Sequence, residues 1–317
     1  MSEAKANNRP ILSVAITPKI DADREELQRA LSALVLEDPS IETRTTGDQI
    51  VLSGMSELCL ESICDRILQE YRIQLDISEP KVIYLETIRK SADGEGKYIR
   101  QTGGSGNYGH CRIRLTPKEA GEGYEFVNEV EDGVIPAKFI EPIDHGIREA
   151  LEVGILYGYP ILDVTATLYN GSYHDTDSNE LAFKFAGSIA AKEAAHRASP
   201  VLLEPVMAVE ARVPEEYMGM VIHNINVRRG RIEGLETAPE SQVIKAVVPL
   251  AEILGYGGNL DSWSQGRFDY SIQFARYEAC PPPGEPGGDG AGVAANKPTA
   301  PKPGRGSAAA RLDRESE

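Results

Sequence analysis

The sequence predicts an α+β protein in which two small βαββαβ units flank a longer α+β unit. Three observations lead to this fold class. Residues 10–80 show strand and helix signals in the order β-α-β-β-α-β, and residues 202–277 repeat that order without obvious sequence identity. The intervening residues 81–200 combine strand patterns, a glycine-rich segment and two helix patterns. The length of 317 residues fits two or three domains, at roughly 100–200 residues per domain.

The first unit is predicted from two hydrophobic periods. Leu12, Val14 and Ile16 alternate with other residues, as in a strand with one buried face. Leu27 and Leu31 lie four positions apart, as on the apolar stripe of an amphipathic helix. The predicted elements are strand Ile11–Ile16, helix Asp23–Glu37, strands Ile41–Thr45 and Gln49–Ser53, helix Ser56–Tyr71 and strand Arg72–Ile77. This order predicts a split, ferredoxin-like fold.

The last unit is predicted in the same way. Gly230 follows the first helix pattern and suits the left-handed position after a helix end. The predicted elements are strand Pro205–Val213, helix Glu215–Arg229, strands Arg231–Thr237 and Gln242–Pro249, a glycine-interrupted helix Ala251–Gln265 and strand Phe268–Tyr277. We therefore expect a second ferredoxin-like fold.

The middle unit contains a strongly predicted helix at Asn179–Ala198. Ser178 is a plausible N-cap, and Ser199-Pro200 ends the helix because the residue before a proline disfavours helical backbone. The other clear elements of this unit are strands Cys111–Leu115, Tyr124–Val130 and Leu162–Tyr169.

The charge distribution combines an acidic whole with local basic clusters. The net charge of −16 argues against binding nucleic acid through the bulk surface. Between Lys97 and Lys118 there is no Asp or Glu, and Arg228, Arg229 and Arg231 form a second basic cluster. Such clusters suit docking to RNA at chosen points. Solvated strand faces would give the same pattern.

Several function classes are excluded by composition. The four cysteines show no CxxC pair or metal spacing, which predicts reduced thiols in a cytoplasmic protein. No uncharged apolar run of about 18 residues exists, and the N-terminus lacks the apolar core of a signal peptide, so we expect no membrane association. Residues 281–317 are rich in Pro, Gly and Ala with almost no large apolar side chains, which predicts a disordered tail.

The segment Gly104–Gly109 matches the pattern GxGxxG. That pattern binds a pyrophosphate only when a helix follows it, and here an alternating strand pattern, HCRIRLTP, follows. We therefore predict a flexible hairpin tip whose glycines let the backbone approach RNA closely. The phosphate-binding pattern GxxxxGK[ST] is absent from the sequence, so no nucleotide cofactor is expected in this chain.

The segment Tyr173–Ser178 permits three interpretations. His174, Asp175 and Asp177 could form a metal or acid–base site, but they lie within four residues and no nucleophile stands out. The Asp and Ser residues are also ordinary helix-start residues. The third interpretation is an exposed recognition loop. The remaining histidines show no shared ligand spacing, so no catalytic or metal residues are predicted.

Several strings closely resemble elongation factor G, continuously over about residues 10–277. They are GMSEL at Gly54–Leu58, KYIRQTGGSGNYGHCRI at Lys97–Ile113, YEFVNEVEDGVIPAKFI at Tyr124–Ile140, GSYHDTDSNELAFKFAGSIAAKEAA at Gly171–Ala195, SPVLLEPVMAVEARVPEEYMG at Ser199–Gly219, RRGRIEG at Arg228–Gly234 and VPLAEILGY at Val248–Tyr256. The resemblance implies domain III at 10–80, an elongated domain IV at 81–200 and domain V at 201–278. Outside these domains, we expect a flexible N-terminus at 1–9 and a disordered tail at 279–317.

The resemblance also implies a function and sites. To move tRNA and mRNA through the ribosome, this family hydrolyses GTP in a domain whose motifs are absent from this sequence. GTP would therefore bind outside this chain. The implied partners are ribosomal RNA and the A-site tRNA and mRNA, with a separate GTPase domain as a further partner of a monomeric chain. The implied RNA contacts are Ser105, Gly106, Asn107, Tyr108, Gly109, His110, Tyr173, His174 and Asp175 at the tip, and Arg228, Arg229 and Arg231 in domain V.

Departures from the family pattern leave a second hypothesis open. Typical members carry Arg and Gln where this chain has Ser105 and Asn107, which removes one positive charge from the tip. A paralogue without GTPase coupling, acting as a regulatory protein-interaction or ribosome-binding module, is therefore an alternative. An enzymatic role is third, because no residue spacing supports it.

Overall fold

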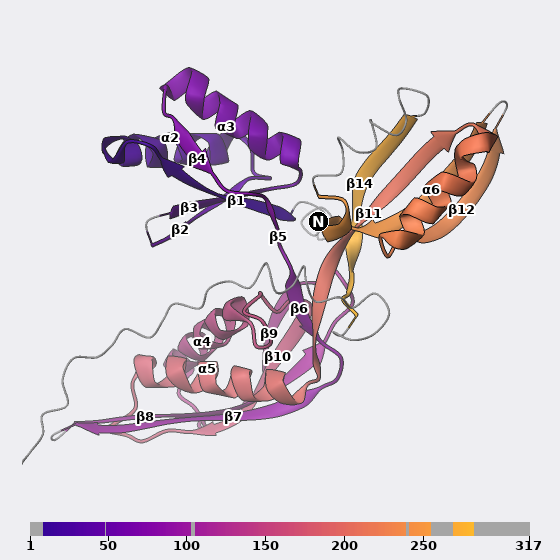
Figure 1. Ribbon diagram of the computed structural model, residues 1–317. Coiled ribbons are helices and arrows are strands. Elements are labelled where there is room, and N and C mark those ends of the chain that lie inside the picture. Colours follow the sequence, from indigo (N-terminus) through magenta and orange to yellow (C-terminus); the bar gives the residue numbers. More distant parts are fainter. Residues whose placement is uncertain (1–8, 48, 103–104, 239–240, 255–268, 282–317) are drawn as a thin grey trace, which may run out of the picture.

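The computed structural model describes residues 9–47, 49–102, 105–238, 241–254 and 269–281, which form three lobes (Figure 1). Mixed sheets and helices confirm the predicted α+β class, with elongation of the middle lobe. The predicted flexible N-terminus and disordered tail fall almost entirely outside the described residues. None of the helices in these ranges is both long and apolar enough to cross a membrane.

The N-terminal lobe has the predicted ferredoxin-like topology. Its strands lie in the order β2-β3-β1-β4 and pair antiparallel, and the buried faces of both helices join one core with β1. Helix α3 begins after Ser56, whose side chain accepts a hydrogen bond from the N–H of Cys59, and ends where Arg72 turns left-handed at φ 58°. That turn explains why the strand predicted from Arg72 begins only at Leu75. The elements are β1 Leu12–Pro18, the 3-10 helix η1 Asp21–Asp23, α2 Arg24–Glu37, β2 Glu42–Thr46, β3 Gln49–Gly54, α3 Glu57–Tyr71 and β4 Leu75–Ile77.

The C-terminal lobe has the equivalent strand order, β12-β13-β11-β14. Its first helix ends at Val227, earlier than predicted, because Arg229 adopts the left-handed backbone at φ 57° that we expected of Gly230. Most of the predicted helix Ala251–Gln265 lies outside the described residues. The elements are β11 Pro200–Val213, α6 Glu215–Val227, β12 Arg231–Ala238, β13 Ser241–Pro249, the 3-10 helix η3 Leu250–Glu252 and β14 Asp269–Ala279.

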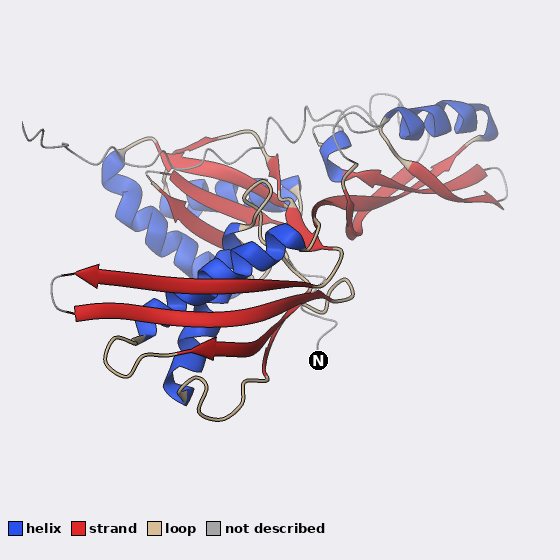
Figure 2. Ribbon diagram, turned by 90° about the horizontal axis from the view of Figure 1, so that it is seen from below, coloured by secondary structure: helices blue, strands red, loops and turns tan. Residues whose placement is uncertain are grey.

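The middle lobe is a four-stranded sheet with both of its α-helices on one face, so that the other face is open (Figure 2). The strand order is β7-β8-β10-β9, in which β9 and β10 are parallel and the other pairs antiparallel. The elements are β7 Ala92–Thr102, β8 Ser105–Pro117, β9 Tyr124–Asn128, the 3-10 helix η2 Ala137–Phe139, α4 Ile140–Val153, β10 Val164–Ser172 and α5 Glu180–Arg197.

The glycines of the middle lobe are used for packing, which corrects one prediction. Residues 105–110, expected as a loose hairpin tip, belong to strand β8. A Cβ atom on Gly109 would lie 2.4 Å from the carbonyl oxygen of Ala182, and one on Gly96 would lie 1.8 Å from that of Ala186. Glycine is therefore required because helix α5 lies directly on the hairpin, with its small residues against the glycines. Of the described glycines in the GxGxxG match, Gly109 packs on α5 and Gly106 lies against the Asp177 side chain.

A short segment connects the three lobes. Strand β5, Lys81–Val82, pairs with β1 of the first lobe, and strand β6, Leu85–Ile88, pairs with β11 of the third. Within β6, the fully buried Glu86 holds a loop of the middle lobe through its carboxylate. Its two oxygens accept hydrogen bonds of 2.7–3.2 Å from the backbone N–H groups of Ile155, Leu156, Tyr157 and Tyr159. The joint is therefore held by hydrogen bonds that leave no part of this charge uncompensated.

Candidate nucleic-acid interface

Two segments that are distant in sequence meet at the end of the middle lobe. The N–H of Tyr108 donates to the carbonyl oxygen of Asp177 at 2.8 Å, and the side-chain amide of Asn179 donates to the side-chain oxygen of Asn107 at 2.7 Å. A Cβ atom on Gly106 would lie 2.6 Å from the Asp177 carboxyl carbon. The predicted residues of β8 and of the loop after β10 thus lie side by side. We call this surface, residues 105–110 with 171–178, the tip.

The loop between β10 and α5 presents its aromatic side chains to solvent. The side chain of His174 is 57% exposed, its Nδ1 lies 3.1 Å from the Thr176 hydroxyl, and its ring centroid is 6.4 Å from that of Tyr108. Tyr173 and Asp175 are exposed as well. An exposed imidazole at a loop apex offers ring donors and a flat stacking face, which are the groups that recognise unpaired RNA bases.

Helix capping in this loop differs from the prediction. Asn179, and not Ser178, caps α5, because its side-chain oxygen accepts the N–H of Ala182 at 2.9 Å. The Ser178 hydroxyl instead accepts the N–H of His174 at 2.9 Å, and the N–H of Ser178 returns a bond to the His174 carbonyl at 3.1 Å. Capping alone therefore does not explain the loop. Its residues form a closed turn that holds His174 outward.

A series of hydrogen-bonded side chains runs from Glu95 on β7 into the tip, where it includes His110, Ser172 and Tyr108. The Glu95 Oε1 lies 2.8 Å from His110 Nε2, His110 Nδ1 lies 2.7 Å from the Ser172 hydroxyl, and that hydroxyl lies 2.7 Å from the hydroxyl of Tyr108. The hydrogen bonds from His110 and then from Arg112 hold the pKa of the Glu95 carboxyl below its usual value. Sequence analysis missed Glu95 and Ser172. Their position opposite His110 follows from strand register, which a single sequence does not give.

The carboxylate–imidazole–hydroxyl connectivity resembles an activated nucleophile, but the surroundings do not match one. The Ser172 hydroxyl is already engaged by Tyr108, and Glu95 and His110 lie next to glycines that pack on α5, so their side chains point to the opposite face of the sheet. In the described parts of the chain, no group of three or more His, Cys, Asp or Glu side chains is placed to hold a metal ion. The arrangement therefore fits binding better than catalysis.

The basic stretch from Lys97 to Lys118 divides into two halves. Away from the tip, Arg112 pairs with Glu95 at 3.1 Å, Arg114 with Asp93 at 2.8 Å, and Lys118 with Glu125 at 2.9 Å. Near the tip, Lys97 and Arg100 are exposed and have no ion-pair partner within the described ranges. Net positive charge on this hairpin is therefore concentrated at its tip end.

The arginine cluster of the C-terminal lobe is engaged inside the protein. Arg229 donates to both carboxylate oxygens of Glu204 at 2.9 and 2.8 Å and to Glu252 at 3.0 Å, and its side chain is only 22% exposed. Arg228 donates to the Glu252 carbonyl at 2.7 Å. Arg231 is 61% exposed and is bidentate to Glu278. Of the three predicted phosphate contacts, Arg231 is the most accessible.

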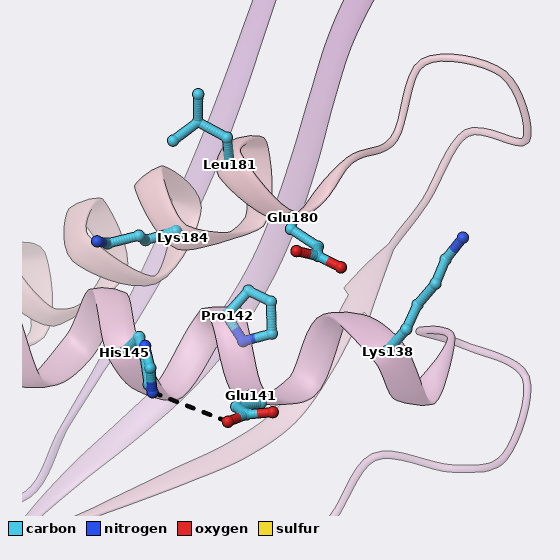
Figure 3. Close-up of a pocket in the computed structure, with 7 residues that line it drawn as sticks. All are labelled: Lys138, Glu141, Pro142, His145, Glu180, Leu181 and Lys184. Atoms are coloured by element: carbon cyan, nitrogen blue, oxygen red, sulfur yellow. Dashed lines mark ion pairs between the residues drawn. The ribbon is translucent and has the colours of Figure 1, made fainter.

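A groove between the starts of α4 and α5 lies next to the tip (Figure 3). Its volume is about 470 Å³. It is lined by Lys138, Glu141, Pro142, His145, Glu180, Leu181 and Lys184. Two carboxylates balance its two ammonium groups, and His145 faces Glu141 at 4.0 Å, so the groove has no surplus charge to select an anion or a cation.

Family models of elongation factor G match the chain in three consecutive segments. Domain III matches residues 8–79, domain IV residues 80–199 and the elongation factor G C-terminus residues 201–284. The chain belongs to the elongation factor G family. The predicted recognition is therefore confirmed, and the N-terminal and middle lobes are its domains III and IV.

A solved structure supports the same relationship. A crystal structure of a protein from Thermus thermophilus is 41% identical in sequence, with a TM-score of 0.65 over 86% of this chain. The chain spans 41% of that protein's length. The match therefore covers domains III to V and leaves the rest of that protein outside the comparison.

Proposed function

We propose that this chain is the ribosome-engaging part of an elongation factor G-like protein and that it acts in tRNA–mRNA translocation by inserting its tip toward the decoding site. The supporting observation is that residues 105–110 and 171–178 meet at one end of the middle lobe, where the side chain of His174 is 57% exposed. Ribosomal RNA, A-site tRNA and mRNA would be its partners. We also propose that it acts as a monomer in the cytoplasm.

The tip is suited to binding by position and charge. The β7–β8 hairpin and α5 pack glycine against alanine, which makes the lobe a stiff support for its end. Lys97 and Arg100 can neutralise phosphates, and His174 can stack on or hydrogen-bond an unpaired base. Because the chain lacks GxxxxGK[ST], nucleotide turnover would come from outside it.

Co-sedimentation with ribosomes over a range of salt concentrations tests the proposal. A triple variant with Lys97→Ala, Arg100→Ala and His174→Ala should bind at least about tenfold more weakly. The slope of log binding constant against log salt concentration should become shallower by about two, because each of the two lost cations removes roughly one phosphate contact. The matched control is Lys245→Ala, a lysine that pairs with Glu236 in the C-terminal lobe. Absence of wild-type binding at low salt would refute the proposal.

Substitution is preferable to deletion of residues 105–110. These residues form strand β8 and pack against α5, so their removal would disrupt the core of the lobe. Each replaced side chain in the triple variant is exposed, and its loss should leave the fold intact.

We propose a second function from the departures from the family pattern at Ser105 and Asn107, which remove one positive charge from the tip. In it, the chain would act as a regulatory module that binds a separate GTPase domain. A pull-down from cell extract distinguishes the two functions, because recovery of a GTPase without ribosomes would favour the second.

A further inference from the structure

The chain of hydrogen bonds beside the tip connects three strands. Glu95 lies on β7, His110 and Tyr108 on β8, and Ser172 at the end of β10. Each contact is 2.7–2.8 Å, and the second Glu95 oxygen is held by Arg112 at 3.1 Å. This series of hydrogen bonds thus connects the Glu95–Arg112 ion pair between two strands to Tyr108, whose ring lies next to that of His174.

The chemistry of the groups fixes the direction of these bonds while His110 is neutral. An ionised carboxylate only accepts hydrogen bonds, so the His110 proton lies on Nε2 and points at Glu95. Nδ1 is then an acceptor and takes the hydroxyl proton of Ser172. The Tyr108 hydroxyl must therefore donate to the Ser172 oxygen, which points the tyrosine proton into the sheet.

Protonation of His110 would reverse the inner bonds. With a proton on both ring nitrogens, Nδ1 becomes a donor to the Ser172 oxygen. The Ser172 proton then needs a new acceptor, and the Tyr108 oxygen at 2.7 Å is already in reach. Tyr108 would accept this bond and turn its own O–H toward solvent, where it could donate a hydrogen bond to a phosphate oxygen.

We propose that Glu95 is a positioning residue for the tip: through His110 and Ser172 it sets the direction of the Tyr108 hydroxyl and couples RNA binding to the protonation of His110. This inference rests on the proposed function, because it assigns a role to the same surface. Binding should tighten as His110 takes up a proton, since both the added charge and the outward Tyr108 donor favour an anionic ligand.

Other charged groups near His110 must be separated from this effect. Lys97 lies opposite it on β7, and His174 is a second imidazole at the same surface. The charged and titratable groups on the surrounding elements are Glu95 and Lys97 on β7, Tyr108 and Arg112 on β8, Tyr169 on β10, and Tyr173, His174, Asp175 and Asp177 in the loop. Measurements in a His174→Gln background remove the one other histidine among them.

The test compares two carboxylates of the same hairpin. Asp93 pairs with Arg114 as Glu95 pairs with Arg112, but no described hydrogen bond leads from Asp93 to the tip. In a His174→Gln background, affinity for purified small ribosomal subunits is measured at about pH 8 and about pH 6. We expect the parent to bind about fivefold more tightly at the lower pH, the factor for roughly one hydrogen bond. Glu95→Gln and Tyr108→Phe should each abolish this increase in affinity.

The double variant decides whether the two residues act through the same series of hydrogen bonds. Glu95→Gln combined with Tyr108→Phe should lose no more than either single variant, and Asp93→Asn should behave like the parent. Additive losses, or an Asp93→Asn effect equal to that of Glu95→Gln, would overturn the proposal.

A measurement on the free protein separates this inference from the proposed function. Nitrogen NMR at about pH 8 should show the His110 proton on Nε2, and Ser172→Ala should remove the response of the Tyr108 ring signals to His110 protonation. A proton on Nδ1 would refute the inference even if ribosomes bind. If ribosomes do not bind but the NMR result is as expected, the proton arrangement stands and the proposed function fails.

Discussion

The tip and the arginine cluster of the C-terminal lobe look alike in the sequence and differ in the structure. Both are short polar strings with several groups that could bind phosphate. At the tip the His174 side chain is 57% exposed, whereas the Arg229 side chain is 22% exposed and its partner Glu204 only 5%. A cluster of cations in the sequence is therefore not by itself evidence of an accessible basic surface, because carboxylates from neighbouring elements can engage it.

The backbone explains this difference. Arg229 follows the end of α6 in a left-handed conformation, and its guanidinium meets Glu204 on β11 and Glu252 in η3. His174 sits in a turn closed by Ser178, and this turn leaves its side chain 57% exposed. The Arg229 side chain is turned toward its own lobe, whereas the His174 side chain is turned toward solvent.

The largest expected effect comes from breaking the buried pair. Arg229→Ala should lower the free energy of unfolding by about 3–5 kcal/mol, because it leaves the buried carboxylate of Glu204 without its partner. Urea denaturation followed by circular dichroism measures the loss. Arg231→Ala, two residues away in an exposed pair, is the matched control and should cost at most about 1 kcal/mol.

The same measurement on the tip sharpens the contrast. His174→Ala should change the free energy of unfolding by less than about 0.5 kcal/mol, since an exposed side chain is removed. A loss equal to that of Arg229→Ala would mean that His174 is structural, and the comparison would fail.

An intermediate effect is expected where the tip is supported. Gly96→Ala should destabilise the protein by about 1–3 kcal/mol or more, because its Cβ would lie 1.8 Å from a backbone oxygen of α5 that cannot move without shifting the helix. Thermal unfolding tests this. The control is Gly219→Ala within α6, where a Cβ meets nothing within 4 Å and the substitution should stabilise by up to about 1 kcal/mol. Equal behaviour of the two variants would contradict the packing argument.

The sequence predicted those secondary-structure elements that depend on hydrophobic periodicity and on local capping and turn residues. The elements of the N-terminal lobe and the helix of the middle lobe follow from such patterns, whereas the family was indicated by the resemblance of whole strings of residues. It did not predict that residues 105–110 form a strand, because Gly109 is required for contact with Ala182 of α5, which is distant along the chain. It also missed Glu95 and Ser172, and it treated Arg229 as free, because cross-strand register and the position of Glu204 are tertiary facts. The RNA-contact residues remain predictions.

The smallest expected effect is a response of the tip to acid. Hydrogen bonds from His110 and from Arg112 lower the pKa of Glu95 from its usual 4.5. A carboxyl whose pKa is lower in the folded protein stabilises the fold above its unfolded pKa, and this contribution disappears as the pH falls through the folded pKa. NMR signals of Tyr108 and His110 should therefore shift in a step below pH 4.5, and Glu95→Gln should abolish that step. High salt should weaken the Arg112 contribution, because exposed pairs are screened. If the step persists in Glu95→Gln, it comes from another carboxyl, such as Asp177. The side chains of the tip are then positioned by the loop before α5 and not by β7.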